Sequence, residues 1–474
     1  MTGAASTAPI EESSYSAKDR PAASEIFPCL LDIAEAMMQC GADVHTVEQL
    51  LVRLGRAYGA ARMNVLVITA EIIVTVSYSG NYELTFSRRV VGEGGTDFAK
   101  LEELSALCRD CLAQCLSVDE LTQRLDAIKR MRAPRLPFYV GGAFSSGGFA
   151  VFFGGSILDG LVSALFALLV CFAIRRFKMF TPNTIVFNFA TSLVVGILIC
   201  LVGATQAVNV NVVIIGVIML LIPGLAMTNA TRDMLSGDTI SGVMRFVESL
   251  LWATSLALGF MAAIWAASAV GIPFGEGGGT VSWSFWQMIP IVTIAALGFA
   301  LFFNVKPRHI LVATLGGVLT WALFSVVQSQ LGGTFVPCVI ASTFAAVYSE
   351  VFARGFRVPN AVFFIIAVIP LVPGRALYYT MYNAVNGDAA TCASFATMTL
   401  LYAAGIAVGI CLIAAIVQTW EIWSERHERA ASVIVNAEKT VLHTSKRALG
   451  KVGIVRNAED PKKGSMDPSQ KPRD

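Results

Sequence analysis

A proline, a glycine and an arginine follow one another inside a long apolar run near the C-terminal end of the chain. Residues 371–388 read LVPGRALYYTMYNAVNGD, with Pro373, Gly374 and Arg375 in succession. Proline removes a backbone donor and glycine weakens a helix, so the pair predicts a helix break. The new helix start offers unpaired N–H groups and a positive dipole end, which suit a carboxylate. Arg375 either adds a fork for the same anion, or snorkels or pairs with a structural carboxylate.

The same pattern occurs 150 positions earlier in the chain. Residues 221–238 read LIPGLAMTNATRDMLSGD, and eleven of the 39 positions from 221 to 259 match those 150 positions later. The apolar composition alone would give about four identities. The chain therefore contains an internal duplication with one Pro-Gly break in each copy, and such paired breaks are typical of secondary transporters.

Candidate site residues flank both breaks. The substrate-binding candidates are Pro223, Gly224, Leu225, Ala226, Thr228 and Asn229 in the first copy, and Pro373, Gly374, Arg375, Ala376, Tyr378 and Tyr379 in the second. Tyrosines near the ends of spans are also common as simple interface residues. Glu248 and Glu350 are candidates for carrying a coupled proton. Local ion pairs with Arg245 and Arg354 are the alternative interpretation of these two carboxylates.

The elements that position these residues must be membrane helices. Of the 474 residues, 55% are hydrophobic and 14% charged, and the mean hydropathy is +0.65. These values exclude a soluble globular protein and predict an α-helical polytopic membrane protein. Ten spans are expected, at 139–157, 160–176, 184–203, 211–230, 242–268, 284–303, 309–328, 334–353, 359–381 and 391–418.

The charges in the loops predict the topology. Lysine and arginine occur in alternate loops, so the positive-inside rule places both termini in the cytoplasm. Five spans separate the two Pro-Gly pairs, and the two copies therefore cross the membrane in opposite directions. The membrane part is predicted as a 5+5 inverted-topology repeat with broken helices, with repeats at 138–270 (spans 1–5) and 284–420 (spans 6–10).

The chain before the first span has a different pattern. Residues 25–137 combine helical periodicity with the alternating, β-branched runs NVLVITAEIIVTVSYSG and YELTFSRRVV, which predicts a cytosolic α/β domain. Residues 1–24 are expected to form a disordered tail. Residues 421–474 are expected to form a cytosolic tail that is first helical and then disordered.

Three cysteines of this domain could bind a metal ion. Cys108, Cys111 and Cys115, completed by Cys40 or His45, would suit zinc. Their spacing is that of one helix face, and burial of that face is the better interpretation. We therefore expect no metal site and no cofactor.

Acidic residues and a histidine of the same domain could serve a hydrolase. Asp43, His45 and Glu48 lie close in sequence, and Glu71 follows. However, neither a Gly-x-Ser-x-Gly elbow nor a His-Glu-x-x-His pair is present. A helix start capped by Asp43 is the better interpretation, so we expect no enzyme and no catalytic residues.

Four segments of the chain resemble the threonine/serine exporter family. They are GADVHTVEQLLVRLG, FFGGSILDGLVSALFALLV, LIPGLAMTNATRDMLSGDTISG and LVPGRALYYTMYNAVNGD, in the family's order, and the resemblance covers roughly residues 25–420. Some bacteria divide this architecture between two proteins, and this chain looks like the fused form. The resemblance implies a secondary exporter of threonine and serine in the bacterial cytoplasmic (inner) membrane, driven by the proton motive force.

Three alternatives remain open at this point. Members of the divided form have been linked to succinate export, so a dicarboxylate exporter is the first alternative. A membrane-anchored hydrolase using residues 25–137 is the second, and a channel is the third. No Walker loop is present, so ATP hydrolysis is not expected, and nothing points to nucleic acid. The expected partners are the substrate, protons and membrane lipid, and a homo-oligomer is open.

Overall fold

The computed structural model describes residues 23–78, 83–90, 95–178, 183–221, 226–227, 230, 233–234, 237–272, 280–417 and 419. Residues up to Ile413 belong to one compact unit. The predicted tails, 1–24 and 421–474, lie outside the described residues, except for Ala23 and Ser24, with which the first helix begins.

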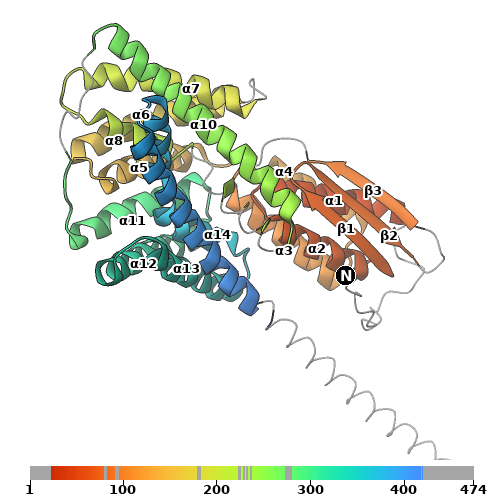
Figure 1. Cartoon of the computed structure of the whole chain (residues 1–474). Coiled ribbons are helices and arrows are strands. Elements are labelled where there is room, and N and C mark those ends of the chain that lie inside the picture. Colours follow the sequence, from red (N-terminus) through yellow and green to blue (C-terminus); the bar gives the residue numbers. More distant parts are fainter. Residues whose placement is uncertain are drawn as a thin grey trace, which may run out of the picture. The chain divides into compact units, whose positions relative to one another are not determined.

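The N-terminal segment, residues 23–130, combines four helices with a three-stranded sheet (Figure 1). The helices are α1 (Ala23–Gln39), α2 (Val44–Ala57), α3 (Phe98–Gln114) and α4 (Val118–Arg130), and the strands are β1 (Arg62–Ile68), β2 (Glu71–Ser77) and β3 (Glu83–Arg89). The strands are antiparallel in the order β1-β2-β3. Ile72, Val74 and Val76 alternate along β2 and are fully buried, so one face of the sheet packs against the helices.

The predicted capping role of Asp43 is confirmed. Asp43 is the N-cap of α2, and its carboxylate accepts hydrogen bonds from the Thr46 backbone N–H at 2.9 Å and from the Thr46 hydroxyl at 2.8 Å. These contacts satisfy a donor that the first turn of a helix leaves free. Asp43 therefore caps the start of α2, as the sequence predicted.

Helices make up the rest of the described chain. They are α5 (Arg135–Phe152), α6 (Ile157–Phe177), α7 (Thr184–Gly203), α8 (Val210–Ile218), α10 (Thr239–Ala269), α11 (Phe285–Phe302), α12 (Pro307–Leu331), α13 (Phe335–Phe356), α14 (Ala361–Val368), the 3-10 turn η2 (Ile369–Leu371), α15 (Gly374–Val385) and a last helix, Ala389–Val417. Seven of those described are long and apolar enough to cross a membrane, or eight if α14 to α15 is one bent span. The chain is thus a polytopic helical membrane protein, and ten spans stay a prediction, since α5 and α8 are not among the eight.

Helix boundaries in the two halves of the membrane part correspond at the offset of 150 residues. Adding 150 to the bounds of α5 gives those of α11, and α6 and α12 begin 150 residues apart. The closest helix contacts recur at the same offset. A Cβ on Gly259 would lie 1.9 Å from Ser192 Oγ, and one on Gly409 would lie 2.0 Å from Ser342 Oγ. The duplication in the sequence therefore has a counterpart in helix length and packing.

Small residues let α5 and α11 approach closely, and this packing gives a first prediction. A Cβ on Gly298 of α11 would lie 2.3 Å from the Ser145 backbone nitrogen of α5. Since backbone cannot yield as a side chain can, Gly298→Val should destabilise the fold by more than the usual 1–3 kcal/mol, roughly, of overpacking. The expected result is little monodisperse protein after detergent extraction, measured by size-exclusion chromatography. Gly355→Val is the control, because a Cβ there meets nothing within 4 Å, and equal yields for both variants would contradict this packing.

Candidate functional site

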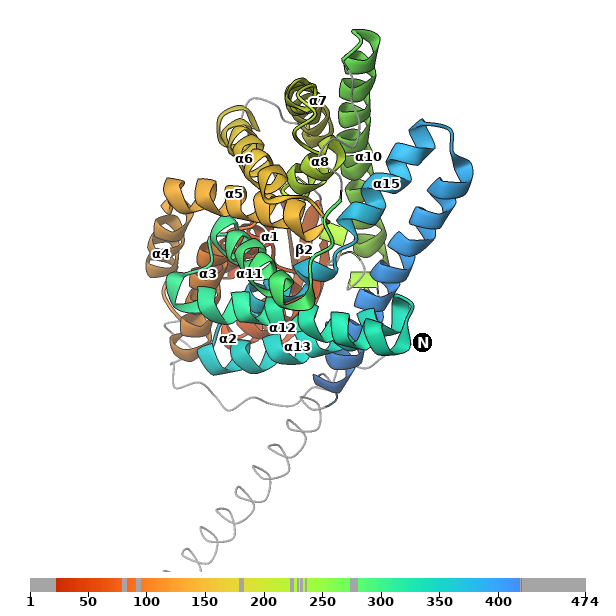
Figure 2. The same ribbon diagram turned by 90° about the vertical axis from the view of Figure 1, so that its left-hand side faces the viewer.

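The second Pro-Gly pair lies at a bend between two helices. Ala361–Leu371 and Gly374–Ala384 are bent by 51° relative to each other. Pro373 is the N-cap of α15, and its side chain makes no capping hydrogen bond. The first N–H groups of a helix have no partner within the helix, so the start of α15 presents donors at the bend. Figure 2 shows α15 leaving this bend beside α10.

A cavity of about 950 Å³, called here the main cavity, opens on one side of the bend. Membrane helices α5, α6, α7, α10, α11 and α14 line it, together with parts of the N-terminal segment. Its polar and charged lining from the membrane helices and their ends is Lys178, Asn183, Thr184, Asn188, Arg245, Glu248 and Ser249. From the N-terminal segment, Gln39, Thr69 and Thr96 line it. The N-terminal segment thus forms part of the wall of the main cavity.

A second cavity, of about 690 Å³, lies on the other side of the bend. Phe138 at the start of α5 lines the main cavity, whereas Phe152 at its end lines the second cavity. At the bend itself, Val372 lines the main cavity and Arg375 lines the second cavity. The Pro373–Gly374 break therefore stands between two cavities at opposite ends of the same helices.

The candidates of the second copy have different surroundings. Arg375 is exposed, and its guanidinium carbon lies 5.6 Å from the centre of the Tyr379 ring. Ala376 is buried. Tyr378 is also buried, and its hydroxyl donates to Asn211 Oδ1 of α8 at 3.3 Å. Arg375 thus faces a cavity, whereas Tyr378 links the two halves of the membrane part.

The candidates of the first copy are mostly outside the described residues. These are Pro223, Gly224, Leu225, Thr228 and Asn229. Ala226 is described, and it lines the main cavity. In this copy the break itself stays a prediction.

The two glutamates differ in their partners. Glu350 accepts from Arg354 Nε at 2.6 Å and from Asn360 Nδ2 at 2.7 Å, as the ion-pair alternative expects. Glu248 is exposed in the main cavity. The ion pair expected between Glu248 and Arg245 is not found among the described residues. Arg245 Nη1 instead pairs with Asp233 Oδ2 at 3.0 Å. Glu248 is therefore the better placed of the two to meet a substrate or a proton.

The sequence interpretation missed the Arg245–Asp233 pair. The two side chains are 11% and 1% exposed, and Arg245 lines the main cavity. A buried pair that borders a cavity can offer its guanidinium to an anion while the carboxylate keeps its position. The sequence does give a signal for the shared cavity, although not for the pair with Asp233. Arg245 and Glu248 are three residues apart in one helix, and this spacing places both on the same face.

Cys108, Cys111 and Cys115, the last of them the C-cap of α3, do not gather around His45. Cys108 and Cys111 are buried in the core of the N-terminal segment, as the helix-face interpretation predicted. Burial raises the pKa of Cys111 to about 11 and that of Cys108 well above its ordinary value, which disfavours the thiolates that zinc requires. Among the described residues, the metal-ligating groups that come together are instead His45, Glu48 and Asp238, without Glu71.

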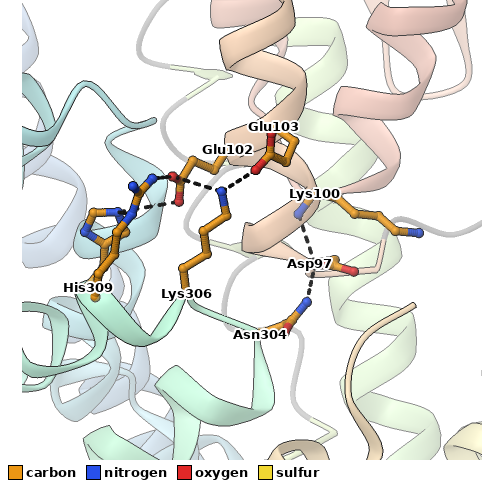
Figure 3. Close-up of polar contacts among 8 residues, drawn as sticks. Asp97, Lys100, Glu102, Glu103, Asn304, Lys306 and His309 are labelled. Atoms are coloured by element: carbon orange, nitrogen blue, oxygen red, sulfur yellow. Dashed lines mark hydrogen bonds and ion pairs between the residues drawn. The ribbon is translucent and has the colours of Figure 1, made fainter. Parts of the chain in front are cut away.

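Ion pairs join the N-terminal segment to the turn between α11 and α12 (Figure 3). Glu102 of α3 accepts from Lys306 Nζ at 3.1 Å and also pairs with Arg308. His309 Nε2 lies 3.5 Å from Glu102 Oε2. The Phe98 backbone N–H donates to the Phe303 carbonyl at 3.0 Å in the same turn. One buried carboxylate therefore holds three basic side chains of the membrane part.

Loss of the Glu102 carboxylate should loosen this connection. The Glu102 side chain is 4% exposed, and removing one partner of a buried pair typically costs about 3–5 kcal/mol. In Glu102→Gln we expect faster limited proteolysis of the purified protein between residues 130 and 135. Glu103→Gln is the control, because that side chain is 40% exposed and its pair with Lys306 is worth less. Equal proteolysis of the two variants would contradict the importance of Glu102.

Comparisons with known proteins agree with this architecture. The ThrE model of threonine/serine exporters matches residues 29–266, and the ThrE_2 model of the same exporters matches residues 288–416. The chain is 24% identical to the threonine/serine exporter of Corynebacterium glutamicum over 337 residues, which are 68% of each chain. It is also 24% identical to the "Probable succinate transporter subunit YjjP" of Klebsiella aerogenes over 233 residues, 48% of this chain and 88% of that one. No solved structure matches it significantly. The chain therefore belongs to the threonine/serine exporter family.

Proposed function

We propose that this chain is a secondary exporter of threonine and serine in the bacterial cytoplasmic membrane, driven by the proton motive force. Its two membrane repeats cross in opposite directions, with ten spans in all and both termini in the cytoplasm. The 150-residue offset of helix bounds and the alternation of basic loops support this arrangement. In this orientation the main cavity faces the cytoplasm, behind the N-terminal segment, and the second cavity faces outward.

The observation that carries the proposal is the bend between two cavities. Val372 and Arg375, on either side of Pro373–Gly374, line different cavities. Alternating access requires a substrate site at such a boundary, reached from one side at a time. A channel needs a continuous pore, and an anchor for a hydrolase needs neither cavity. The geometry therefore favours a transporter over both alternatives.

The charges of the main cavity favour a zwitterion. Arg245 can meet a carboxylate, and Glu248, three residues later, can meet an ammonium group. The amide of Asn188 lines the same cavity and suits the hydroxyl that threonine and serine share. A dicarboxylate would find Glu248 repulsive, since like charges at close range cost free energy. Threonine and serine therefore fit the main cavity better than succinate, and succinate is the second candidate because of the relationship to the Klebsiella protein.

The Glu248 carboxylate can couple the export of the substrate to the import of a proton. If Glu248 holds either an ammonium group or a proton, the substrate leaves outward on one step and a proton returns on the next. Arg375 then receives the departing carboxylate in the second cavity. Glu350 is less suited to this role, because Arg354 and Asn360 already hold its two oxygens.

Export from intact cells tests the proposed substrates. Cells that express the protein, and cells with an empty vector, are loaded with threonine- or serine-containing dipeptides, and efflux of threonine, serine and succinate is followed by mass spectrometry. We expect faster efflux of threonine and serine that collapses with an uncoupler. Faster efflux of succinate alone would move the assignment to dicarboxylates, and no difference for any of the three would reject an exporter of these solutes.

A further inference from the structure

Two parts of the chain that are far apart in sequence bring a histidine and two carboxylates together. His45 and Glu48 belong to α2, and Asp238 is the residue before α10. One ligand atom from each of the three lies within 4.8 Å of the other two, and His45 Nδ1 is 3.9 Å from Asp238 Oδ2. The His45 and Asp238 side chains are 29% and 25% exposed, so an ion from solution can reach them.

Asp238 occupies a capping position without acting as a cap. It precedes α10, but its side chain accepts no capping hydrogen bond. Its counterpart in the second copy, Asp388, accepts from the Thr391 backbone N–H at 3.1 Å. In Asp238 the Oδ2 atom is buried and has no hydrogen-bond partner among the described residues, and it is the atom nearest His45. In the first copy, Asp238 therefore does not cap its helix, and its Oδ2 atom lies beside the His45 imidazole without a hydrogen-bond partner among the described residues.

The cluster is also short of positive charge. Glu48 Oε1 accepts from the Val67 backbone N–H at 2.8 Å, which fixes the carboxylate and leaves its second oxygen available. Among the described residues, no lysine or arginine forms an ion pair with Glu48 or with Asp238. A cation between the two carboxylates would supply the missing positive charge.

We propose that His45, Glu48 and Asp238 bind a divalent transition-metal ion, zinc or manganese, which ties α2 to the start of α10. One imidazole and two carboxylates form a mixed donor set that these ions accept and that magnesium and calcium, which prefer oxygen alone, accept less well. Water completes the coordination. Bond lengths near 2.0–2.2 Å, roughly, require the three side chains to draw together by small rotations around the ion.

A neighbouring glutamine can set the tautomer that the site needs. Gln49 Nε2 lies 2.9 Å from His45 Nε2. A half-turn of this amide would present Oε1 to His45 Nε2 instead, so that Nε2 carries the proton and the Nδ1 lone pair is directed toward Asp238. Such contacts behind a ligand histidine are usual in metal sites and raise its affinity.

The ion would act next to α10, a helix that lines the main cavity. Ser241 Oγ of α10 donates to the Val67 carbonyl of β1 at 3.2 Å, beside the cluster. Arg245 and Glu248 follow in the next two turns of α10. Binding would thus hold the N-terminal segment against the helix that carries the cavity's charges and would slow its opening. Binding itself is independent of the proposed function, whereas this effect on transport rests on it.

The test measures zinc binding to the purified full-length protein in detergent. Protein freed of metal with a chelator is titrated with zinc chloride and, separately, with manganese chloride, and the bound ion is counted by mass spectrometry after equilibrium dialysis. We expect one ion per chain in the wild type, and affinity at least tenfold lower in His45→Ala and in Asp238→Asn. Asp388→Asn is the matched control and should bind as the wild type does. Size-exclusion profiles and circular dichroism verify that each variant is folded.

The outcomes separate the two proposals. Zinc binding that is unchanged in both His45→Ala and Asp238→Asn would overturn the site and would place the ion elsewhere, for example on cysteines. No stoichiometric binding of zinc or manganese to the wild type would overturn it as well. If binding depends on the two residues but the protein exports neither threonine nor serine, the metal site stands and the proposed function falls.

Discussion

Arg375→Leu should lower threonine and serine export by one to two orders of magnitude while the protein still inserts into the membrane. Among the described residues that line the second cavity, Arg375 is the charged one, and the departing carboxylate must exchange one partner for another there. A hydrogen bond to a charged group contributes about 1.5–3 kcal/mol, which corresponds to roughly 10- to 150-fold in rate. Export from dipeptide-loaded cells measures the effect, with the amount of membrane protein determined by immunoblot.

Two further variants make the role of Arg375 specific. Arg375→Lys keeps the charge but loses the planar fork, so intermediate export is expected. Ser329→Ala changes another residue that lines the second cavity and should leave export nearly unchanged. Undiminished export by Arg375→Leu would remove Arg375 from the substrate path and would leave it as an interface residue stacked on Tyr379.

Glu248→Gln should abolish coupling and reduce threonine export by at least tenfold, roughly the loss of one charge-assisted contact. The glutamine can neither bind a proton nor neutralise an ammonium group, although it keeps the shape of the side chain. The expected signature in proteoliposomes is that residual threonine transport no longer responds to an imposed pH gradient. Succinate transport, if the protein performs any, should be unaffected or faster, because a negative charge is gone from the main cavity.

Glu350→Gln is the matched control for this prediction. Glu350 is a second glutamate in a membrane helix, but Arg354 and Asn360 bind its carboxylate. Its loss should reduce the amount of folded protein more than it changes coupling. A result in which Glu350→Gln uncouples transport while Glu248→Gln does not would reverse the assignment of the two residues.

The helix break could be predicted from the sequence because it depends on local chemistry. Pro373 and Gly374 disfavour a continuous helix whatever surrounds them, and the structure has a bend of 51° at that point. Helix ends were less accurate. The first span, expected to end at 157, ends at Phe152, because Ser156 and Asp159 form a capping box that starts the next helix. The Ser-x-x-Asp spacing of this capping box is readable in the sequence.

Contacts between distant segments could not be predicted in this way. Neither periodicity nor spacing indicates that Asp233 pairs with Arg245, or that Asp238 meets His45, some 190 residues earlier. The cavity that Arg375 lines likewise depends on how four helices pack, since α5, α11, α12 and α15 all contribute to it. Local patterns identified residues whose side chains could bind a substrate or a proton, and tertiary packing decided which of them share a cavity.

Transport by purified protein in proteoliposomes tests the central claim most directly. Vesicles are loaded with labelled threonine, serine or succinate, and a pH gradient of either sign is imposed. Proton-coupled export predicts that threonine and serine leave the vesicles faster when protons move in the opposite direction, that the effect vanishes with an uncoupler, and that Glu248→Gln transports without responding to the gradient. Transport of succinate alone, or transport of threonine that ignores the pH gradient in the wild type, would contradict it.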